Sequence, residues 1–236
     1  MHPSFQIVSG ILIGDFMVAF FHWLEDTYLP WTDAPGWVGD IARDNEMHHF
    51  IPFGIVSGST WKTANVTGPL SLILGAVVYI LAPQWTRSHL PLVFTMMIVG
   101  AISNAVHKYI HERPCTRPRI ITWLQDAGIL ISSQQHAEHH TIADKKYGVI
   151  LNFTNSVYDT LHVWRILEAI LPIEPARKRP ISEYTALYDT NLTENMKKPC
   201  PQIISQKNLD NYMSTLHREY NTRNTIPASP ESAGIK

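Results

Sequence analysis

Uncharged, apolar stretches alternate with polar segments along this chain. No charged residue occurs between Lys62 and Arg87, and none occurs in the stretch 90–106. Residues 66–83 are long enough to cross a membrane as one helix, and residues 90–106 form a second, shorter candidate. The pattern therefore predicts a membrane hairpin with a short loop at residues 84–89.

A third apolar run extends over residues 5–24 and contains one charged residue, Asp15. A carboxylate is costly in lipid, so we expect Asp15 to face the protein interior or the functional site. No basic segment precedes the run and no small-residue cleavage pattern follows it, which is not typical of a secretory signal peptide. We expect this run to be a third membrane-spanning helix.

Two further segments, residues 120–133 and 157–171, mix apolar positions with charges. Such a mixture is typical of helices that lie at the membrane surface rather than cross it. From residue 172 onward the chain is polar and punctuated by prolines, a composition typical of disorder. We therefore predict a membrane domain over residues 1–172 and a polar, partly disordered cytoplasmic tail over residues 173–236.

The charge distribution predicts an orientation. If each of the three runs crosses once, the loop 84–89 lies on one side, and 18 of the 19 Lys and Arg residues lie on the other; only Arg87 is in the loop. Basic residues concentrate on the cytoplasmic side of membrane proteins. The expected fold is all-α: a polytopic membrane protein with about three to four transmembrane helices and a cytoplasmic histidine-rich helical cap.

Composition adds less than the pattern. The mean hydropathy of −0.07 would suit a soluble protein, but it averages the apolar runs with polar segments. The two cysteines, Cys115 and Cys200, form no paired motif and fit a reducing compartment. We accordingly expect the sequons at Asn65, Asn152 and Asn191 to remain unmodified. The net charge of −1 gives no indication of nucleic-acid binding.

Eight of the 12 histidines fall into tight groups. One pair is four residues apart and a later triplet is spaced i, i+3, i+4, so on helices each set shares one face. The eight are His22, His48, His49, His107, His111, His136, His139 and His140. Neutral imidazole suits zinc, copper, iron and nickel, and eight ligands exceed what one ion accepts. These residues predict a site for two metal ions.

Other metal chemistries fit the pattern less well. A zinc metalloprotease needs His-Glu-x-x-His, but the required second position after His111 and Glu112 is Cys115. Carboxylate di-iron bundles need two Glu-x-x-His pairs, and only Glu46 with His49 has that spacing. A haem held by two histidines would use fewer of them, on opposed helices within the membrane. These three classes are disfavoured.

Four strings of the sequence resemble a known family. They are His-Trp-Leu-Glu-Asp-Thr-Tyr at 22–28, Glu-Met-His-His at 46–49, Asn-Ala-Val-His-Lys-Tyr-Ile-His at 104–111 and His-Ala-Glu-His-His at 136–140. In order and spacing they are similar to the plasmanylethanolamine desaturases. That family includes the Kua and CarF proteins and the plastid desaturase that places a trans-3 double bond in phosphatidylglycerol. The resemblance extends over about residues 14–168, and the segment 50–66 departs from the family's pattern.

The resemblance implies a membrane lipid desaturase of the endoplasmic reticulum, with its site facing the cytoplasm. It implies a di-iron centre that uses O2 and electrons from a cytochrome b5-type donor, with the eight clustered histidines as iron ligands. The implied reaction converts the 1-O-alkyl chain of an ethanolamine phospholipid to the vinyl ether of a plasmalogen. The alternative is trans-3 desaturation of an acyl chain in phosphatidylglycerol.

Four polar residues near the histidines receive expected roles. Asp26 and Glu46 are predicted to accept hydrogen bonds from the imidazoles and so to fix the orientation of the rings. Asp15 and Asn104 are predicted to make polar contacts inside the membrane. Asp26, Glu46 and Asn104 lie within strings that contain a clustered histidine, and Asp15 precedes His22 by seven residues.

Two non-enzymatic classes share the clustered histidines. A histidine-rich metal transporter should place its ligands along the membrane spans, whereas these histidines flank the apolar runs. A catalytically silent metal-binding scaffold is the other alternative. Iron content together with O2-dependent turnover would separate the desaturase from both.

Overall fold

The computed structural model of the chain describes residues 2–29, 36–50, 67–112, 116–141 and 144–173, with residue 175. All of them belong to one compact unit, Met1–Cys200. The described residues form helices and no strand, with one isolated bridge between Leu130 and Leu151. The predicted all-α class is confirmed for this part of the chain. The helices are α1 (Pro3–Tyr28), α2 (Trp37–Phe50), α4 (Thr67–Leu81), α5 (Pro83–Ser88), α6 (Leu90–His111), α7 (Arg119–Asp126), α8 (Ser133–Thr141), α9 (Thr154–Thr160) and α10 (Val163–Ile170).

Two helices are long and apolar enough to span a membrane. Helix α1 has 26 residues and α6 has 22, which correspond to about 39 and 33 Å of helix; a hydrocarbon core is about 30 Å thick. Helix α4 covers most of the first arm of the predicted hairpin but has only 15 residues. The described residues thus contain two candidate spans, and the expected count of three to four stays a prediction. The predicted tail at 173–236 lies outside the described residues except for Ile173 and Pro175.

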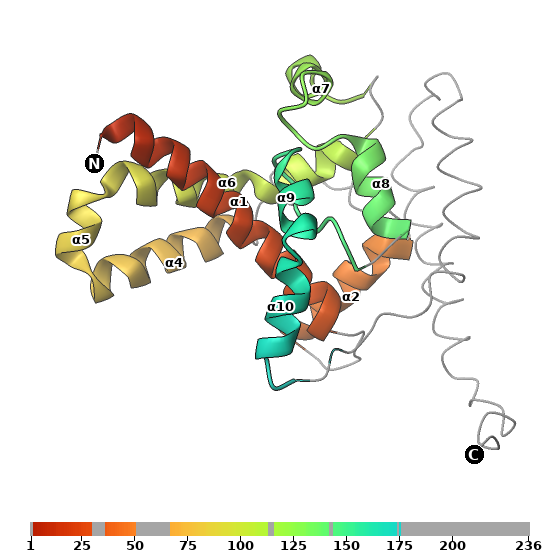
Figure 1. The fold of residues 1–236 in the computed structure, drawn as a ribbon, viewed down its shortest axis with the longest axis horizontal. Coiled ribbons are helices and arrows are strands. Elements are labelled where there is room, and N and C mark those ends of the chain that lie inside the picture. Colours follow the sequence, from red (N-terminus) through yellow and green to blue (C-terminus); the bar gives the residue numbers. More distant parts are fainter. Residues whose placement is uncertain are drawn as a thin grey trace, which may run out of the picture. The chain divides into compact units, whose positions relative to one another are not determined.

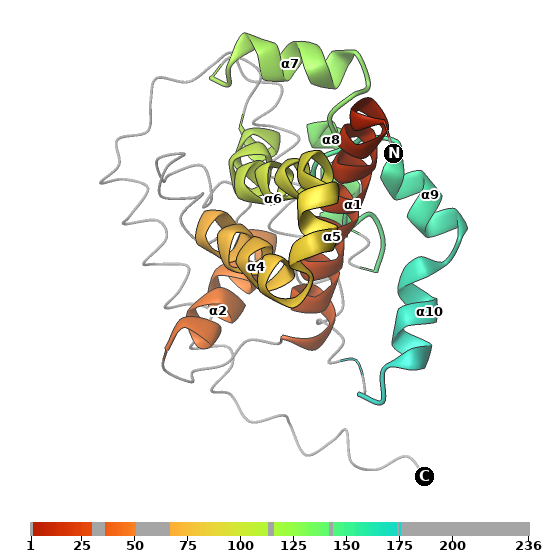
Figure 2. The same cartoon turned by 90° about the vertical axis from the view of Figure 1, so that its left-hand side faces the viewer.

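Helix α6 packs against both α1 and α4, and Figures 1 and 2 show α5 joining α4 to α6 near the N-terminus. A Cβ atom on Gly10 would lie 2.7 Å from the carbonyl oxygen of Leu92, and one on Gly14 would lie 2.9 Å from Cβ of Val99. Glycine at these positions lets the two backbones approach closely, as in other small-residue contacts of membrane helices. Gly10 lies against Leu92 and Gly14 lies against Val99, so the contacts follow the same order along both helices. Helices α1 and α6 are therefore parallel, and their C-terminal ends meet.

The lone carboxylate of the apolar run 5–24 is fully enclosed by protein. Asp15 is 0% exposed, and it accepts hydrogen bonds from the backbone N–H of Leu151 at 2.9 Å and the hydroxyl of Tyr158 at 3.2 Å. A buried polar group without such partners would cost roughly 2–7 kcal/mol. The prediction that Asp15 faces the protein interior is confirmed, and the contacts tie α1 to α9 and the segment before it.

The two mixed segments contain shorter helices than the sequence pattern indicated. Helix α7 ends at Asp126, and Gly128 follows with a positive φ of 70°. Helices α9 and α10 are separated at His162, which has a φ of 52°. Positive φ interrupts a right-handed helix, so each segment turns where a single helix would have continued.

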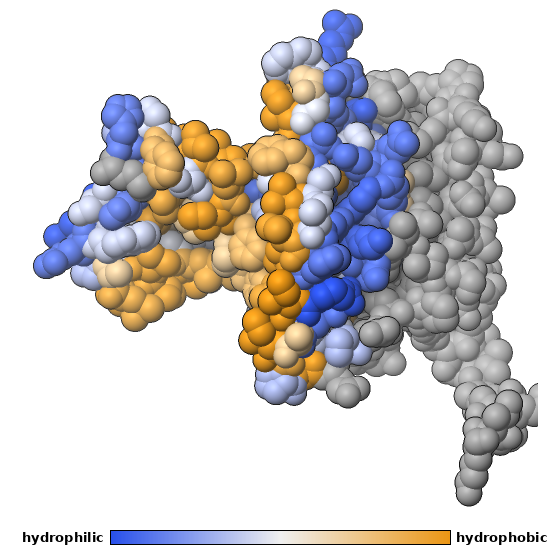
Figure 3. All heavy atoms as spheres, in the orientation of Figure 1, coloured by the Kyte–Doolittle hydropathy of each residue, from blue (hydrophilic) through white to orange (hydrophobic). Residues whose placement is uncertain are grey.

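Helices α9 and α10 have one protein-facing side and one exposed apolar side. Trp164 is buried against Trp23 of α1, with ring centroids 5.9 Å apart. The exposed apolar residues along the two helices include Val157, Leu161, Ile166 and Ile170. Figure 3 shows an apolar band over α9 and α10, with hydrophilic residues beside it on the side of α8. This two-sided arrangement is the one expected of helices at a membrane surface.

Candidate metal centre

The clustered histidines come together where the C-terminal ends of α1 and α6 meet α2 and α8. Each of the eight is buried, with relative exposures from 0% for His139 to 8% for His107 and His111. Helix α1 contributes His22, α2 contributes His48 and His49, α6 contributes His107 and His111, and α8 contributes His136, His139 and His140. Four helices far apart in sequence thus direct imidazoles into one interior space.

Helical spacing explains why single helices supply several rings. His107 and His111 are one turn apart on α6, and their ring centroids lie 5.0 Å from each other. His136 and His140 are likewise one turn apart on α8, with centroids 4.7 Å apart. Residues four apart share a helix face. The predicted placement of both sets on helices, with their rings in a common space, is confirmed.

Four imidazoles form a first group, which we call the four-histidine group: His48, His111, His136 and His140. The Nε2 atom of His136 lies 3.1 Å from Nε2 of His111 and 3.0 Å from Nε2 of His140. The Nε2 atom of His107 lies 2.9 Å from the same atom of His136. One ring nitrogen has a single proton or a single lone pair to offer, so these three approaches cannot all be hydrogen bonds at once. Nitrogens that bind one shared ion at about 2.0–2.1 Å would lie roughly 3.0–3.4 Å from one another.

Three imidazoles and a carboxylate form a second group, which we call the carboxylate group: His22, Asp26, His49 and His139. One oxygen of Asp26 lies 3.1 Å from Nε2 of His139 and 3.5 Å from Nε2 of His22. The other lies 3.1 Å from Nε2 of His49 and accepts a hydrogen bond from the amide of Asn45 at 2.8 Å. Imidazole nitrogens with a carboxylate oxygen are a donor set that suits first-row transition metals.

Backbone carbonyls bind the opposite ring nitrogen of three of these histidines. In each case Nδ1 donates to a carbonyl oxygen; the pairs are His22 with Tyr147 at 2.9 Å, His139 with Lys145 at 2.6 Å and His48 with Asn45 at 2.8 Å. A carbonyl only accepts, so the proton lies on Nδ1 and Nε2 keeps its lone pair. Metal-binding histidines in proteins are typically held this way. Within the described part of the chain, Nε2 of His48 has no hydrogen-bond partner.

Burial keeps these rings in the metal-binding form. Desolvation lowers the pKa of His48, His136 and His140 well below the ordinary value of imidazole, and the neighbouring imidazoles lower it further. Neutral imidazole is the form that binds metal. At neutral pH an ion would therefore not have to displace a proton from these three residues.

The two groups adjoin each other. The ring centroid of His49 lies 4.5 Å from that of His48 and 4.5 Å from that of His140, and His22 lies 5.6 Å from His107 by the same measure. A donor set dominated by nitrogen favours iron, zinc, copper or nickel over magnesium or calcium. The residues present therefore fit two transition-metal ions in one buried space.

Asp26 lies differently from what the sequence indicated, and two residues that the sequence did not indicate, Lys145 and Tyr147, contact the histidines. The sequence predicted that Asp26 lies outside the metal ligands and orients their rings. In the structure its carboxylate contacts Nε2 of His22, His49 and His139. The side chain of Glu46 lies outside the described residues, and Asn104 is half-buried on α6, so their expected roles stay predictions. No sequence pattern indicated Lys145 or Tyr147, because a backbone carbonyl can orient a histidine whatever the side chain of its residue.

The chain is similar to known lipid desaturases. The sequence model of a family described as the lipid desaturase domain matches residues 11–180. A probable fatty acid desaturase of Acanthamoeba polyphaga mimivirus is 28% identical over 195 residues, which cover 78% of this chain and 90% of the viral protein. The chloroplastic fatty acid desaturase 4 of Arabidopsis thaliana is 23% identical, over 72% of this chain and 52% of the plant protein.

A bacterial relative carries a more specific name. The plasmanylethanolamine desaturase of Myxococcus xanthus is 24% identical to this chain, over 70% of it and 59% of the bacterial protein. The chain thus spans little more than half of the plant and bacterial relatives that it matches, but nearly all of the viral one. No solved structure matches the chain.

Proposed function

The chain belongs to the lipid desaturase family, an oxidoreductase family, and from this premise we propose that it is a di-iron desaturase of membrane ether lipids. The proposed reaction converts the 1-O-alkyl chain of an ethanolamine phospholipid to the vinyl ether of a plasmalogen. One observation carries the proposal: eight buried histidines converge where the ends of two long apolar helices meet, seven of them in two adjoining groups and His107 beside the first group.

The proposed chemistry requires an oxidant that side chains alone do not provide. Removal of two hydrogens from adjacent carbons releases two electrons and two protons; with two more electrons from a donor and two more protons from solvent, one O2 becomes two waters. Two bound iron ions would supply the power to activate O2 for this step. The four-histidine group and the carboxylate group would hold one ion each, with His107 beside the first.

The protein's own contribution is a dry and preorganised setting. Carbonyl oxygens fix the rings of His22, His48 and His139, so little rearrangement is needed when an ion binds. Tyr147 is buried against the rings of His22 and His139, and Trp23 is buried in the same hydrophobic cluster as Tyr147. Exclusion of water protects a strongly oxidising centre from side reactions.

The depth of the site suits a bond close to the lipid headgroup. His22 and Asp26 lie in the last two turns of α1, and α6 ends at His111. If α1 and α6 span the membrane, the metal centre lies at its boundary, where the first carbons of a lipid chain are found. The carbon atoms next to the glycerol oxygen in an alkyl ether meet this requirement without a deep tunnel.

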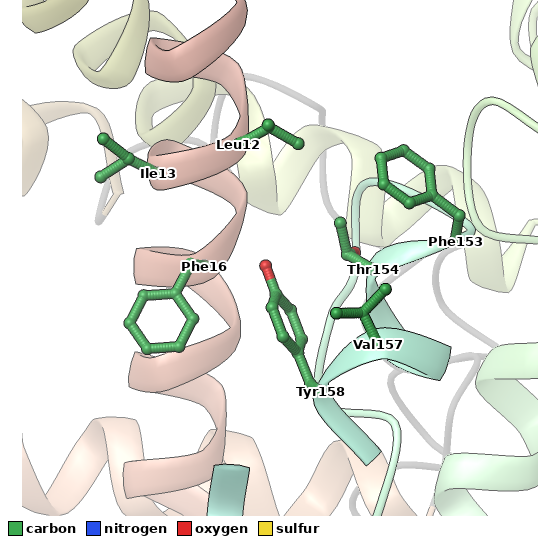
Figure 4. A pocket seen from close by; sticks show the side chains of 7 residues that line it. All are labelled: Leu12, Ile13, Phe16, Phe153, Thr154, Val157 and Tyr158. Carbon is green, nitrogen blue, oxygen red and sulfur yellow. The ribbon is translucent and has the colours of Figure 1, made fainter. Parts of the chain in front are cut away.

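An apolar groove supports a lipid substrate. It has a volume of about 370 Å³ and lies between α1 and α9. Figure 4 shows its lining: Leu12, Ile13 and Phe16 from α1, with Phe153, Thr154, Val157 and Tyr158 from the start of α9. No histidine lines it. Phe16 precedes His22 by six residues and Leu12 precedes it by ten, so the groove lies about 9–15 Å below the metal centre along α1.

We assign this groove to a hydrocarbon chain of the substrate. A phospholipid whose headgroup lies at the level of the metal centre has its chains at the level of the groove. Val157 belongs both to the lining of the groove and to the apolar band of α9 and α10, the side that we propose faces lipid. Its lining offers mostly carbon atoms, which bind a chain through burial of apolar surface.

The proposed setting follows from the charge distribution. Lys108, Arg117 and Arg119 lie near the histidine end of α6, which favours a cytoplasmic metal centre in a multi-pass protein of the endoplasmic reticulum. A cytochrome b5-type protein, docking from the cytoplasm, is the proposed source of the two electrons.

A second candidate substrate is an acyl chain. Its support is the similarity to chloroplastic fatty acid desaturases, whose identities of 23–24% equal that of the plasmanylethanolamine desaturase. Trans-3 desaturation of an acyl chain in phosphatidylglycerol also concerns a bond near the headgroup. The position of the metal centre therefore suits both reactions.

The deciding experiment is expression in cells that cannot make plasmalogens but are supplied with an alkylglycerol. We expect acid-labile vinyl ethers in the ethanolamine lipids of these cells, and none in cells that express His140→Ala. New double bonds in phosphatidylglycerol without vinyl ethers would favour the acyl substrate. Neither product from an iron-loaded protein, while a plasmanylethanolamine desaturase restores vinyl ethers in parallel, would refute both assignments.

A further inference from the structure

One short loop serves two histidines of the carboxylate group. The carbonyl oxygen of Tyr147 accepts from Nδ1 of His22, and the carbonyl oxygen of Lys145 accepts from Nδ1 of His139. The side chains of these two histidines come from α1 and α8. Loop 145–148 is thus the element that orients both rings toward Asp26.

Helix α9 holds this loop through two side chains. The amide of Asn155 accepts from the backbone N–H of Gly148 at 2.7 Å and donates to its carbonyl oxygen at 2.9 Å. One turn later, Asp159 accepts from the backbone N–H of Lys146 at 3.4 Å. Residues four apart share a helix face, so one face of α9 makes hydrogen bonds to the loop at two points.

Asn155 is buried and packs closely against Gly148. This side chain is 3% exposed, and its two hydrogen bonds satisfy both backbone groups of one residue. A Cβ atom on Gly148 would lie 2.7 Å from the amide oxygen of Asn155, so only glycine leaves room for this contact. Lys146 has a positive φ of 58°, a conformation that a non-glycine residue seldom adopts without support from its surroundings.

The four-histidine group does not depend on the loop in this way. His48 is oriented by the carbonyl of Asn45, three residues earlier on its own helix α2. His111 comes from α6, and His136 and His140 come from α8. Loss of the loop conformation would therefore release rings of the carboxylate group first.

We propose that Asn155 is a positioning residue that controls metal binding by the carboxylate group alone, through its two hydrogen bonds to loop 145–148. This inference rests on the proposed two-metal centre. The two metal positions then depend on different parts of the protein. The residues of the four-histidine group are held by α2, α6 and α8, whereas the carboxylate group also needs α9. Loss of outer contacts of this kind typically weakens metal binding 10–100-fold.

The test is an anaerobic titration of the metal-free protein, residues 1–236, in detergent with Fe²⁺, and with Co²⁺ as a spectroscopic probe. Parent protein and Ser156→Ala, an exposed neighbour on α9, should bind two ions. Asn155→Ala should bind one ion with parental affinity and the second about 10–100-fold more weakly. Gly148→Ala, which places a methyl group against the amide of Asn155, should behave like Asn155→Ala.

Equal weakening of both ions in Asn155→Ala, or none, would overturn the proposal. If that variant does not fold, Asp159→Ala takes its place, because it removes the hydrogen bond to the backbone N–H of Lys146. The proposal is then judged by the same criterion. A parent protein that binds fewer than two ions would instead refute the two-metal centre itself. The absorption bands of the first Co²⁺ ion should not change among the variants, which a general loss of structure would not allow.

Discussion

Asp26 places a carboxylate oxygen 3.1 Å from Nε2 of His139, the ring nitrogen opposite the Nδ1 that donates to the carbonyl oxygen of Lys145. An outer residue that merely orients a ring would contact the other nitrogen, as the carbonyl of Asn45 does for His48. The contact therefore favours Asp26 as a fourth donor to the metal beside His22, His49 and His139.

The first prediction tests this role. Asp26→Asn keeps the size of the side chain but removes its charge, so we expect the carboxylate group to bind its ion at least about 10–100-fold more weakly, the loss that removal of an outer contact alone would cause. The four-histidine group should be unaffected. Anaerobic Fe²⁺ titration measures both positions, and Asp40→Asn, an exposed carboxylate on α2, is the matched control. Two ions bound with parental affinity by Asp26→Asn would show that the carboxylate is not a ligand.

The second prediction concerns the four-histidine group. His136→Ala and His140→Ala remove rings whose Nε2 atoms lie 3.0 Å apart, so each should abolish desaturation and lower iron to about one ion per chain. His89→Ala should retain both iron and activity, because its ring stacks on Trp85 beyond the metal centre. Iron analysis of purified protein checks this. Unchanged iron in both His136→Ala and His140→Ala would contradict the assignment.

The sequence predicted the members of the site better than their grouping. Helical periodicity places His107 with His111, and His136 with His140, on common faces, and the structure confirms this. The division into two groups depends on how α2 and α8 pack against α1 and α6. Spacing along one helix contains no such information, so it could not indicate that His49 would join His22 and Asp26.

The surface helices show a similar limit. Apolar composition correctly marked residues 120–133 and 157–171 as amphipathic, yet His162 turns the second segment into α9 and α10. Loop 145–148 was not predicted at all, since its role is carried by carbonyl groups that every residue possesses. Local propensity is a weak prior where tertiary contacts fix the backbone.

The third prediction tests the contact between the two long helices. A side chain at Gly14 would meet Val99 at 2.9 Å, and overpacking of this kind costs about 1–3 kcal/mol. Gly14→Leu should separate α1 from α6, lower the thermal unfolding temperature in detergent and reduce iron, because the two helices supply ligands to the same site. Gly68→Leu has open space around it and should match the parent. Parental stability and iron in Gly14→Leu would refute this packing.

The fourth prediction tests the groove between α1 and α9. Val157→Trp should fill it, because Val157 lines the cavity opposite Leu12. We expect a several-fold higher KM for the lipid substrate with unchanged iron content, since no histidine lines the groove. Ile166→Trp, an exposed apolar position on α10 outside the groove, is the control. An equal rise in KM for both variants would mean that the groove does not bind the substrate chain.

The last prediction concerns orientation. Helix α6 has 22 residues, about 33 Å, so α5 lies one membrane thickness from the metal ligands at its other end. Arg87 is the only basic residue of residues 84–89, whereas 18 of the 19 basic residues fall on the histidine side, which is therefore expected to be cytoplasmic. A glycosylation acceptor inserted at 84–89 should be modified in microsomes and shift on endoglycosidase treatment; one placed after residue 173 should not. The natural sequons at Asn65, Asn152 and Asn191 serve as internal controls and should stay unmodified. The reverse pattern would place the metal centre in the lumen, where a cytoplasmic electron donor could not reach it.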